Sequence, residues 1–349
     1  MLNPVVVYNS KFRYFQEEIF MANFAMLGKW HVHAPGYARE AISFGGTCKA
    51  VWDPDYEVAK AWAADLGCEA IECLDCLLAR EDIDSVIVGT PTSMHHEVIM
   101  KAAKAKKHIF TEKTLAPTVA ECEEIKAAIE EAGVLFEISY PHRTWPPVLY
   151  AKQIVESGIL GQISIGRFRN AHGGASGGWL PEYWYEKKDA CGGAMMDLGC
   201  HPMYISAYLF GKPVRISSMY NTLTDKPVDD NAVNTIEFKN KAIAIVETSF
   251  VTPYSPWAFE IYGTEGFLLA TDQKVMITTP ETRKYTNDMV AVPENKMPKR
   301  LDNQLKNFID AVDGKAEIYF GLDDAIDLAR LLENAYISDE KGIIVDIKN

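Results

Sequence analysis

The decapeptide FAMLGKWHVH at residues 24–33 begins the stretch of sequence that decides the fold. Its first four residues form a short apolar run typical of a buried strand, and Gly28 then permits a tight turn. Residues 34–41 have the apolar spacing of an amphipathic helix, and residues 48–51 form a second apolar run. The stretch therefore predicts a β-α-β unit, in which a helix joins two parallel strands.

The same alternation of apolar runs and amphipathic stretches continues to residue 139. Thr118 and Glu121 form a capping box at the start of one expected helix, and Gly133 ends it. Repeated β-α-β units predict an α/β domain with a Rossmann-type doubly wound sheet over residues 21–143. The other elements expected in this domain are helices at 56–66 and 96–105 and strands at 85–88, 108–111 and 134–139.

The pattern changes after Arg143. Short apolar strands separated by tight turns follow one another between residues 214 and 279, which is typical of an antiparallel sheet. We therefore expect residues 144–349 to form an α+β domain with a mostly antiparallel open sheet. Its expected helices are 148–156, 195–210, 301–312 and 322–338, and its expected strands are 163–169, 215–220, 232–238, 242–250, 258–262, 266–270 and 343–347.

The composition excludes several classes of protein. The chain of 349 residues carries 35 Lys and Arg against 48 Asp and Glu, so its net charge of −13 is unsuited to nucleic acids or anionic membranes. No apolar run approaches the roughly 18 residues of a membrane span. Seven cysteines at irregular positions favour a cytoplasmic location, and we expect Cys73 and Cys76 to serve packing rather than zinc or redox chemistry.

The first twenty residues fit poorly with the rest, because a doubly wound domain normally begins at its first strand. Gln16-Glu17-Glu18 can be encoded by a purine-rich ribosome-binding sequence just upstream of Met21. We hypothesise that Met21 is the natural start and that residues 1–20 are a non-native or flexible extension. The alternative is a genuine arm that packs on a neighbouring subunit.

Two features of the first half indicate a dinucleotide site. Gly28 supplies the turn after the first strand, although the rest of the G-x-G-x-x-G pattern is absent. Asp53 ends the second strand 25 residues later, where an acid accepts hydrogen bonds from the adenosine ribose and repels a 2′-phosphate. This favours NAD over NADP, while the alternative is an ordinary turn at Asp53-Pro54-Asp55.

Three motifs resemble those of the Gfo/Idh/MocA oxidoreductase family. Residues 89–95, GTPTSMH, and 110–114, FTEKT, each follow a strand, and residues 192–201, GGAMMDLGCH, resemble the family's G-G-x-x-x-D-x-G-x-H signature. Thr114 stands where the family usually has Pro. The resemblance implies NAD as the cofactor and a set of cofactor-binding residues: Leu27, Gly28, Lys29, Trp30, His31, Asp53, Thr90, Pro91, Thr92, His95, Glu112, Lys113 and Arg143.

The resemblance also implies a catalytic set of Lys113, Asp197 and His201. His201 is assigned as the principal acid/base, Lys113 as the group that polarises the substrate hydroxyl, and Asp197 as their electrostatic partner. Asp197 and His201 are four residues apart, so they would share one helix face, and histidine titrates near neutrality. The alternatives are a solvated lysine at a strand end and an exposed or capping aspartate.

Substrate contacts are expected from the signature and from the aromatic loop before it. Arg143 contacts cofactor or substrate, or it forms an interdomain salt bridge, and the loop aromatics pack on sugar C–H surfaces or form a loop core. We expect no metal, because no compact ligand spacing joins His31, His33 and the His95-His96 pair. The expected substrate-binding residues are Lys113, Arg143, His172, Trp179, Trp184, Asp197 and His201.

The function that these features predict is NAD-dependent hydride transfer. The expected substrate is a sugar, polyol or sugar derivative that reacts at a secondary hydroxyl or ketone. Two alternatives remain: a redox-neutral NAD-dependent glycosidase of the same family, and a non-catalytic NAD or sugar sensor. The resemblance also implies a homodimer or homotetramer, and no nucleic acid or membrane is expected as a partner.

Overall fold

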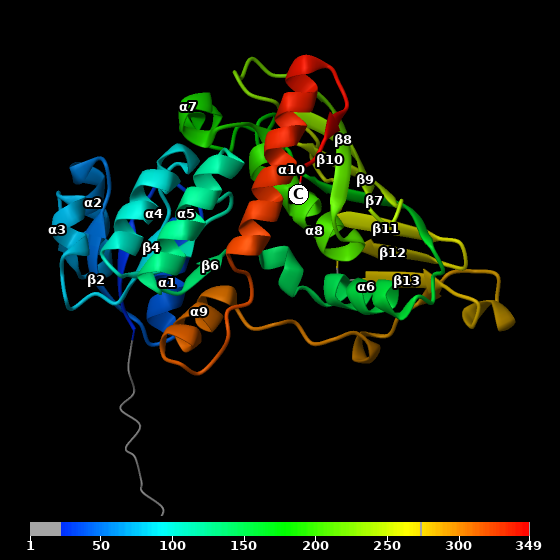
Figure 1. The fold of residues 1–349 in the computed structure, drawn as a ribbon, viewed down its shortest axis with the longest axis horizontal. Coiled ribbons are helices and arrows are strands. Elements are labelled where there is room, and N and C mark those ends of the chain that lie inside the picture. Colours follow the sequence, from blue (N-terminus) through cyan, green and yellow to red (C-terminus); the bar gives the residue numbers. More distant parts are fainter. Residues whose placement is uncertain (1–21, 273, 349) are drawn as a thin grey trace, which may run out of the picture.

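The computed structural model of the chain describes residues 22–272 and 274–348. Its first half contains a six-stranded sheet with the order β3-β2-β1-β4-β5-β6, in which every pairing is parallel (Figure 1). This order is that of a doubly wound dinucleotide-binding sheet. The strands are β1 (Asn23–Leu27), β2 (Thr47–Trp52), β3 (Glu69–Ala70), β4 (Ser85–Val88), β5 (His108–Thr111) and β6 (Phe136–Ile138).

Helices cover both faces of this sheet because successive side chains of a strand point to opposite sides. In β1, Phe24 and Met26 face one buried cluster, whereas Ala25 and Leu27 face the other. Local signals fix the helix ends: Asp55 caps one helix, and the Thr118 and Glu121 capping box starts another. The helices are α1 (Ala34–Ser43), α2 (Tyr56–Leu66), α3 (Leu74–Leu78), α4 (His95–Lys104) and α5 (Val119–Ala132).

The second half contains a nine-stranded sheet with the order β14-β13-β12-β11-β7-β10-β9-β8-β15. All of its pairings are antiparallel except that of β7 with β10. This confirms the predicted fold class. The strands are β7 (Ile163–Ala171), β8 (Pro213–Asn221), β9 (Asn231–Phe238), β10 (Ile243–Ser249), β11 (Ala258–Gly263), β12 (Phe267–Thr271), β13 (Lys274–Thr278), β14 (Val290–Ala291) and β15 (Val345–Asp346).

The helices of the second half lie on one side of this sheet. They are α6 (Pro146–Ser157), α8 (Cys200–Phe210) and α10 (Leu322–Lys341), and α10 also lies against α5 between the two halves (Figure 1). A short helix, α7 (Lys187–Ala190), follows the aromatic loop. The other side of the sheet carries exposed apolar side chains: Ile165, Met219, Val233, Ile243 and Tyr262.

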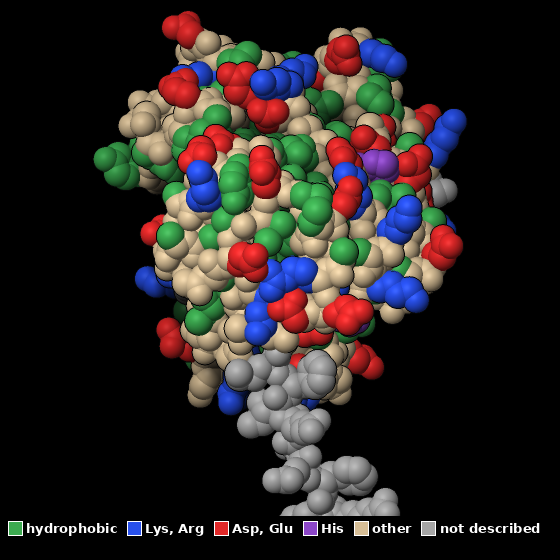
Figure 2. All heavy atoms as spheres, turned by 90° about the vertical axis from the view of Figure 1, so that its left-hand side faces the viewer, with side chains coloured by type: hydrophobic (Ala, Val, Ile, Leu, Met, Phe, Trp, Pro, Cys, Tyr) green, Lys and Arg blue, Asp and Glu red, His purple; other side chains and the backbone are tan. Residues whose placement is uncertain are grey.

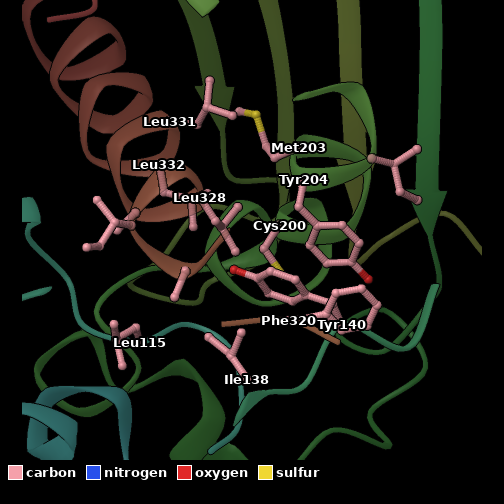
Figure 3. Close-up of a cluster of buried hydrophobic side chains, with 14 of the residues drawn as sticks. Leu115, Ile138, Tyr140, Cys200, Met203, Tyr204, Phe320, Leu328, Leu331 and Leu332 are labelled. Atoms are coloured by element: carbon pink, nitrogen blue, oxygen red, sulfur yellow. The ribbon is translucent and has the colours of Figure 1, made fainter. Parts of the chain in front are cut away.

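One hydrophobic cluster joins the two halves (Figure 3). Leu115, Ile138 and Tyr140 come from the first half, and Tyr140 stacks on Tyr204 of α8 with ring centroids 4.3 Å apart. Leu328, Leu331 and Leu332 of α10 complete the cluster beside Cys200, Met203 and Phe320. Because these side chains are buried together, the halves share a core, and their relative position is fixed by packing.

The C-terminal region also returns to the first half. Helix α9 (Gln304–Val312) packs on α1, and its Leu305, Phe308 and Ile309 are buried with Phe24 and Met26 of β1. Residues 144–349, expected as one domain, therefore also supply part of the core of residues 22–143. The extension expected at residues 1–20 lies outside the described residues.

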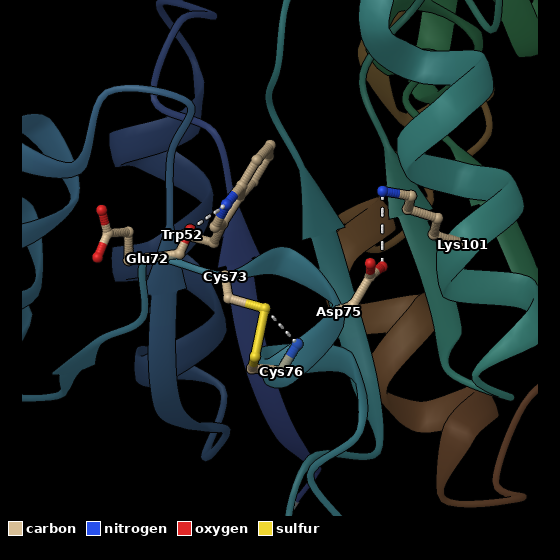
Figure 4. Close-up of a disulfide and its surroundings, with 6 residues drawn as sticks. All are labelled: Trp52, Glu72, Cys73, Asp75, Cys76 and Lys101. Atoms are coloured by element: carbon tan, nitrogen blue, oxygen red, sulfur yellow. Dashed lines mark hydrogen bonds and ion pairs between the residues drawn. A yellow bond between two sulfur atoms is a disulfide. The ribbon is translucent and has the colours of Figure 1, made fainter.

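The structure corrects two local predictions. Residues 195–210, expected as one regular helix, begin with a π-helical turn (Met195–Gly199) before α8. Cys73 and Cys76, expected to serve only packing, form a disulfide (Figure 4). Cys73 precedes the first turn of α3, and the helical turn brings the side chain three residues later next to it, so the C-x-x-C spacing favours this bond.

The surface is mixed in charge rather than patterned for a polyanion. On the face of the first half shown in Figure 2, acidic and basic side chains are interspersed. Within the described residues, no helix has both the length and the apolar composition to cross a membrane.

We predict that Phe308→Ala lowers the free energy of unfolding by about 3–5 kcal/mol, because this fully buried ring would leave a cavity between α9 and the first sheet. Phe308→Leu, which keeps part of the volume, should cost less. Urea denaturation followed by circular dichroism measures both. Unfolding free energies that match the unmodified chain would show that α9 does not belong to the first core.

Candidate active site

A buried ion pair lies where the two halves meet. Lys113 follows β5, and its Nζ lies 2.6 Å from Asp197 Oδ1 and 2.6 Å from the Asp197 carbonyl oxygen. The lysine side chain is 3% exposed and the aspartate side chain 21% exposed. The peptide bond from Lys113 to Thr114 is cis. The structure therefore brings together two residues of the expected catalytic set.

The π-helical turn presents two oxygens of Asp197 to Lys113: the backbone carbonyl oxygen and the carboxylate Oδ1. The carbonyl oxygen of Asp197 accepts hydrogen bonds from Lys113 and from Cys200 Sγ, at 2.9 Å for the latter. A wider turn at this position is typical of functional sites in helices. The turn is anchored by Asp229, whose carboxylate accepts from the amides of Gly193 and Met195 at 2.9 and 2.8 Å.

The electrostatics of the pair favour its ionised form. Burial alone would raise the pKa of Asp197, but the Lys113 ammonium and the two nearby histidines together outweigh burial and lower the pKa of the carboxyl. Burial would likewise lower the pKa of Lys113, but Asp197, together with Cys200 and Glu112, outweighs burial and raises the pKa of the ammonium. Each charge therefore stabilises the other in a site that excludes most water.

His201 lies in α8 and is oriented by a tyrosine rather than by Asp197. Its Nδ1 lies 2.8 Å from the Tyr204 hydroxyl, and its ring lies 4.3 Å from the His142 ring. Burial, followed by the nearby charges of His142 and Lys113, lowers the pKa of His201 well below its usual value. The ring is therefore neutral at neutral pH. The oxygens of Asp197, expected as the electrostatic partner of Lys113 and His201, bind Lys113 and Trp184 instead of the His201 ring.

Glu112, the neighbour of Lys113, is the centre of a second buried cluster. Its Oε1 lies 2.8 Å from His33 Nδ1, its Oε2 lies 3.7 Å from His31 Nε2, and it accepts a hydrogen bond from the Tyr37 hydroxyl. Burial would raise the pKa of Glu112, but the two histidines and the Lys113 ammonium together outweigh burial and hold this pKa far below its usual value. The carboxylate is therefore ionised.

The turn after β1 has the features of a dinucleotide cradle. Gly28 has a φ of 85°, and a Cβ there would lie 2.6 Å from Thr90 Cγ2. Among the described residues the buried Thr90 hydroxyl has no hydrogen-bond partner, so it is available to a ligand at the turn. Asp53 is 9% exposed, and its Oδ2 accepts from the Lys29 amide at 2.8 Å. This part of the site fits the adenosine and phosphate groups of a dinucleotide.

His95 connects the two motif loops instead of pointing to a ligand. Its ring nitrogens lie 2.8 Å from the Thr114 carbonyl and 3.1 Å from the Thr90 carbonyl. Burial lowers the pKa of His95, so the neutral ring donates to one carbonyl at a time. Both loops are thereby fixed beside Lys113.

Two tryptophans close the site. Trp30 of the turn stacks on Trp184 of the aromatic loop, with ring centroids 4.6 Å apart and planes at 10°. Trp184 also donates from Nε1 to Asp197 Oδ2 at 3.2 Å. The space remaining beside Lys113 and Thr114 is about 20 Å³, which holds about one water molecule. A space of this size is too small for a sugar or nicotinamide ring.

Two other expected substrate-binding residues, Arg143 and His172, bind other side chains or the backbone of this chain. Arg143 pairs with Asp324, and its guanidinium lies over the rings of Tyr208 and Phe320, which is the salt-bridge alternative. His172 stacks on Phe250, and its Nδ1 accepts from the Gly174 amide, while Trp179 is 60% exposed. Of the remaining expected cofactor-binding residues, Leu27 is the last residue of β1, and Pro91 and Thr92 follow β4.

Sequence reasoning missed several residues of the site. Tyr204 and His142 adjoin His201, Tyr37 binds Glu112, and the Tyr336 hydroxyl lies 2.9 Å from Asp229 Oδ1. Only the position of Tyr204 one turn after His201 gave a local signal. The others come from distant parts of the chain.

Two family models match this chain. Residues 24–140 match an oxidoreductase family with an NAD-binding Rossmann fold. Residues 148–269 match the GFO/IDH/MocA C-terminal domain. Together they cover the parallel sheet, the signature and most of the second sheet.

The relatives of this chain include an uncharacterized oxidoreductase, a dehydrogenase and a hydratase. YrbE, an uncharacterized oxidoreductase of Bacillus subtilis (strain 168), is 26% identical over 313 residues, 86% of this chain and 89% of that protein. The scyllo-inositol 2-dehydrogenase (NAD(+)) of the same organism is 28% identical over 295 residues, 81% and 84%. A 2,7-anhydro-N-acetylneuraminate hydratase of Escherichia coli (strain K12) is 30% identical over 231 residues, 63% and 59%.

A solved structure shows that the fold is shared. Levoglucosan dehydrogenase in complex with NADH superimposes with a TM-score of 0.83 at 20% identity, covering 94% of this chain and 99% of that one.

We predict that Lys113→Met lowers the free energy of unfolding by about 3–5 kcal/mol, because it leaves Asp197 charged and without its partner in a buried site. Asp197→Asn should also destabilise the chain. The double variant should lose clearly less than the sum of the two, since no unpaired charge remains. Additive losses in urea denaturation, agreeing within about 0.5 kcal/mol, would contradict the coupling.

Proposed function

The chain belongs to the Gfo/Idh/MocA oxidoreductase family, and we propose that it transfers a hydride between NAD and a secondary hydroxyl or ketone of a sugar, polyol or sugar derivative. The observation that carries the proposal is the Lys113–Asp197 ion pair at the end of β5, where the parallel sheet meets the second domain. Bound NAD would supply the hydride acceptor or donor.

The ion pair would stabilise the charge that develops on the substrate oxygen, and His201 would accept the proton of the substrate hydroxyl. Oxidation of an alcohol carbon requires a base for the hydroxyl proton and a positive group for the alkoxide that develops. The Lys113 ammonium supplies the positive charge, and Asp197 keeps it in place. Neutral His201, whose Nδ1 faces Tyr204, would take the proton on Nε2.

The cofactor would be held at the turn after β1. Asp53 would accept hydrogen bonds from the adenosine ribose, and the backbone around Gly28 with the Thr90 hydroxyl would contact the phosphates. Of the other expected contacts, Lys29, Trp30 and His31 belong to the same turn. Arg143 is better explained as an interdomain ion pair with Asp324.

Substrate and nicotinamide would be admitted by movement of the aromatic loop. Trp184 fills the space beside Lys113 and is also hydrogen-bonded to Asp197. Withdrawal of Trp184 would open the site, and its return would exclude water from the reacting atoms. Trp179 on the exposed part of this loop, with His172 behind it, is available to contact a sugar.

A redox-neutral reaction is the second candidate. The 30% identical relative from Escherichia coli is named a hydratase, and a glycosidase that oxidises a sugar carbon only transiently would use the same Lys113 and His201. The two candidates differ in their products, because only the dehydrogenase accumulates NADH with each oxidised substrate molecule.

We predict that Lys113→Ala and His201→Ala each lower turnover by about 100-fold or more, since each removes a group that acts on the reacting proton or oxygen. A panel of sugars and polyols with NAD, followed by NADH absorbance, identifies the substrate and measures the loss. NADH binding, followed by fluorescence, should persist in both variants.

Lys101→Ala and His96→Gln are the matched controls, because these residues of α4 pair with surface carboxylates away from the site. Both controls should keep full turnover. Unchanged turnover in Lys113→Ala would refute the assignment of that residue, and glycoside cleavage without NADH accumulation would favour the redox-neutral candidate.

We predict that Asp53→Asn reduces the preference for NAD over NADP by about tenfold or more. The amide keeps an oxygen for the Lys29 N–H but removes the negative charge that repels a 2′-phosphate. Titration of the chain with NADH and NADPH measures the two dissociation constants. An unchanged ratio would show that Asp53 serves only the turn at Pro54.

We further propose a cytoplasmic homodimer or homotetramer that buries the exposed face of the nine-stranded sheet. Met219 and Val233, which face each other across β8 and β9, are 77% and 44% exposed. Changing both to Lys should yield the 39.0 kDa monomer in light scattering, whereas Ile42→Lys on α1 should keep the assembly. A monomeric unmodified chain would refute the assembly.

A further inference from the structure

The cluster of His31, His33 and Glu112 has the composition of a transition-metal site. One ligand atom from each residue lies within 4.8 Å of the other two. Two imidazoles and a carboxylate are the donors that Zn²⁺ and related divalent ions take in open sites. Spacing along the chain does not reveal the cluster, because Glu112 lies 79 residues from His33 and meets it only through the fold.

The negative charge of Glu112 is paired with two imidazoles, which are positive only when protonated. Glu112 is 1% exposed, and among the described residues its ion-pair partners are the two histidines alone. The nearby Lys113 ammonium is directed at Asp197. A buried carboxylate requires a compensating positive charge, which a divalent ion between the three side chains would supply.

Outer contacts hold the ligands in place. The Tyr37 hydroxyl binds Glu112 and lies 2.9 Å from Ser139 Oγ, so the carboxylate is fixed from behind. Such second contacts to the ligands are a regular feature of metal sites. His31 is 4% exposed and packs edge-on against Trp184, with ring centroids 5.0 Å apart.

Of the three ligands, His33 is the one that reaches solvent. Its side chain is half-exposed and lines a cleft of about 400 Å³ with Tyr37, Ser139 and Arg300. Three protein ligands leave one tetrahedral position free, which a water molecule would fill from this side.

Small side-chain movements would complete the geometry. Tetrahedral Zn²⁺ with bonds of about 2.0–2.2 Å places its ligand atoms about 3.3 Å apart. The His33–Glu112 distance of 2.8 Å would lengthen, and the His31–Glu112 distance of 3.7 Å would shorten. Binding through His31 Nε2 moves the ring proton to Nδ1, so the long 3.2 Å contact from the His33 amide would be given up.

We propose that His31, His33 and Glu112 bind one divalent transition-metal ion, with Zn²⁺ as the preferred occupant. The site adjoins the Lys113–Asp197 pair, since the Lys113 amide donates to Glu112 Oε2 at 2.9 Å, and the proposal does not rest on the proposed hydride transfer. It departs from the expectation of no metal, which considered spacing along the sequence only.

The test is isothermal titration of the full chain with Zn²⁺ after treatment with a chelator and without NAD. The unmodified chain should bind one ion per chain at this site. His33→Gln, which changes a half-exposed side chain, and Glu112→Gln should each weaken binding by about 10-fold or more. Absorption of the Co²⁺ form should show tetrahedral coordination without a thiolate band.

The controls separate this site from other ligands. His96→Gln removes a surface imidazole beside Glu124, and Cys48→Ser removes a thiol whose Sγ lies 3.7 Å from that of Cys68. Both variants should bind like the unmodified chain. Absence of saturable binding, unchanged affinity in His33→Gln, or loss of binding in Cys48→Ser would overturn the proposal.

Discussion

The ion pair between Lys113 and Asp197 is the interaction on which the rest of the site depends. It places opposite charges from two domains 2.6 Å apart in a region that excludes most water. Removing either charge alone leaves the other buried and costly, so neither domain can shift without disturbing the pair. The shared core around Tyr140 and Tyr204 fixes the same domain arrangement through packing.

The elements around the pair follow from this constraint. The π-helical turn directs a carbonyl and a carboxylate oxygen of Asp197 to one ammonium, and Asp229 anchors the start of that turn. Trp184 uses the remaining Asp197 oxygen, so closure of the aromatic loop and the position of the charge are coupled. The same loop residue packs against His31, and the Lys113 amide donates to Glu112 Oε2 at 2.9 Å, so the pair and the His31–His33–Glu112 cluster adjoin each other.

Local signals predicted most of the secondary structure, and the motifs predicted the pair. The strands at 85–88 and 108–111 and the helix at 56–66 end where expected, because apolar runs and capping residues act over a few positions. Contacts between distant segments had no such signal. The packing of Phe308 on the first sheet and the meeting of His33 with Glu112 depend on the complete fold. The π-helical turn was missed because its residues have ordinary helical spacing.

The central claim is that a secondary carbon of the substrate exchanges hydride with NAD, while Lys113, Asp197 and His201 act on the hydroxyl group of that carbon. It is tested most directly by incubating the chain with NAD and sugars or polyols that carry deuterium on their secondary carbons. The account predicts that the NADH formed contains deuterium and that the labelled substrate reacts more slowly. In Asp197→Asn, formation of NADH and of the oxidised substrate should both be lost. Conversion of the substrate without deuterium in NADH, whichever secondary carbon carries the label, would contradict the account.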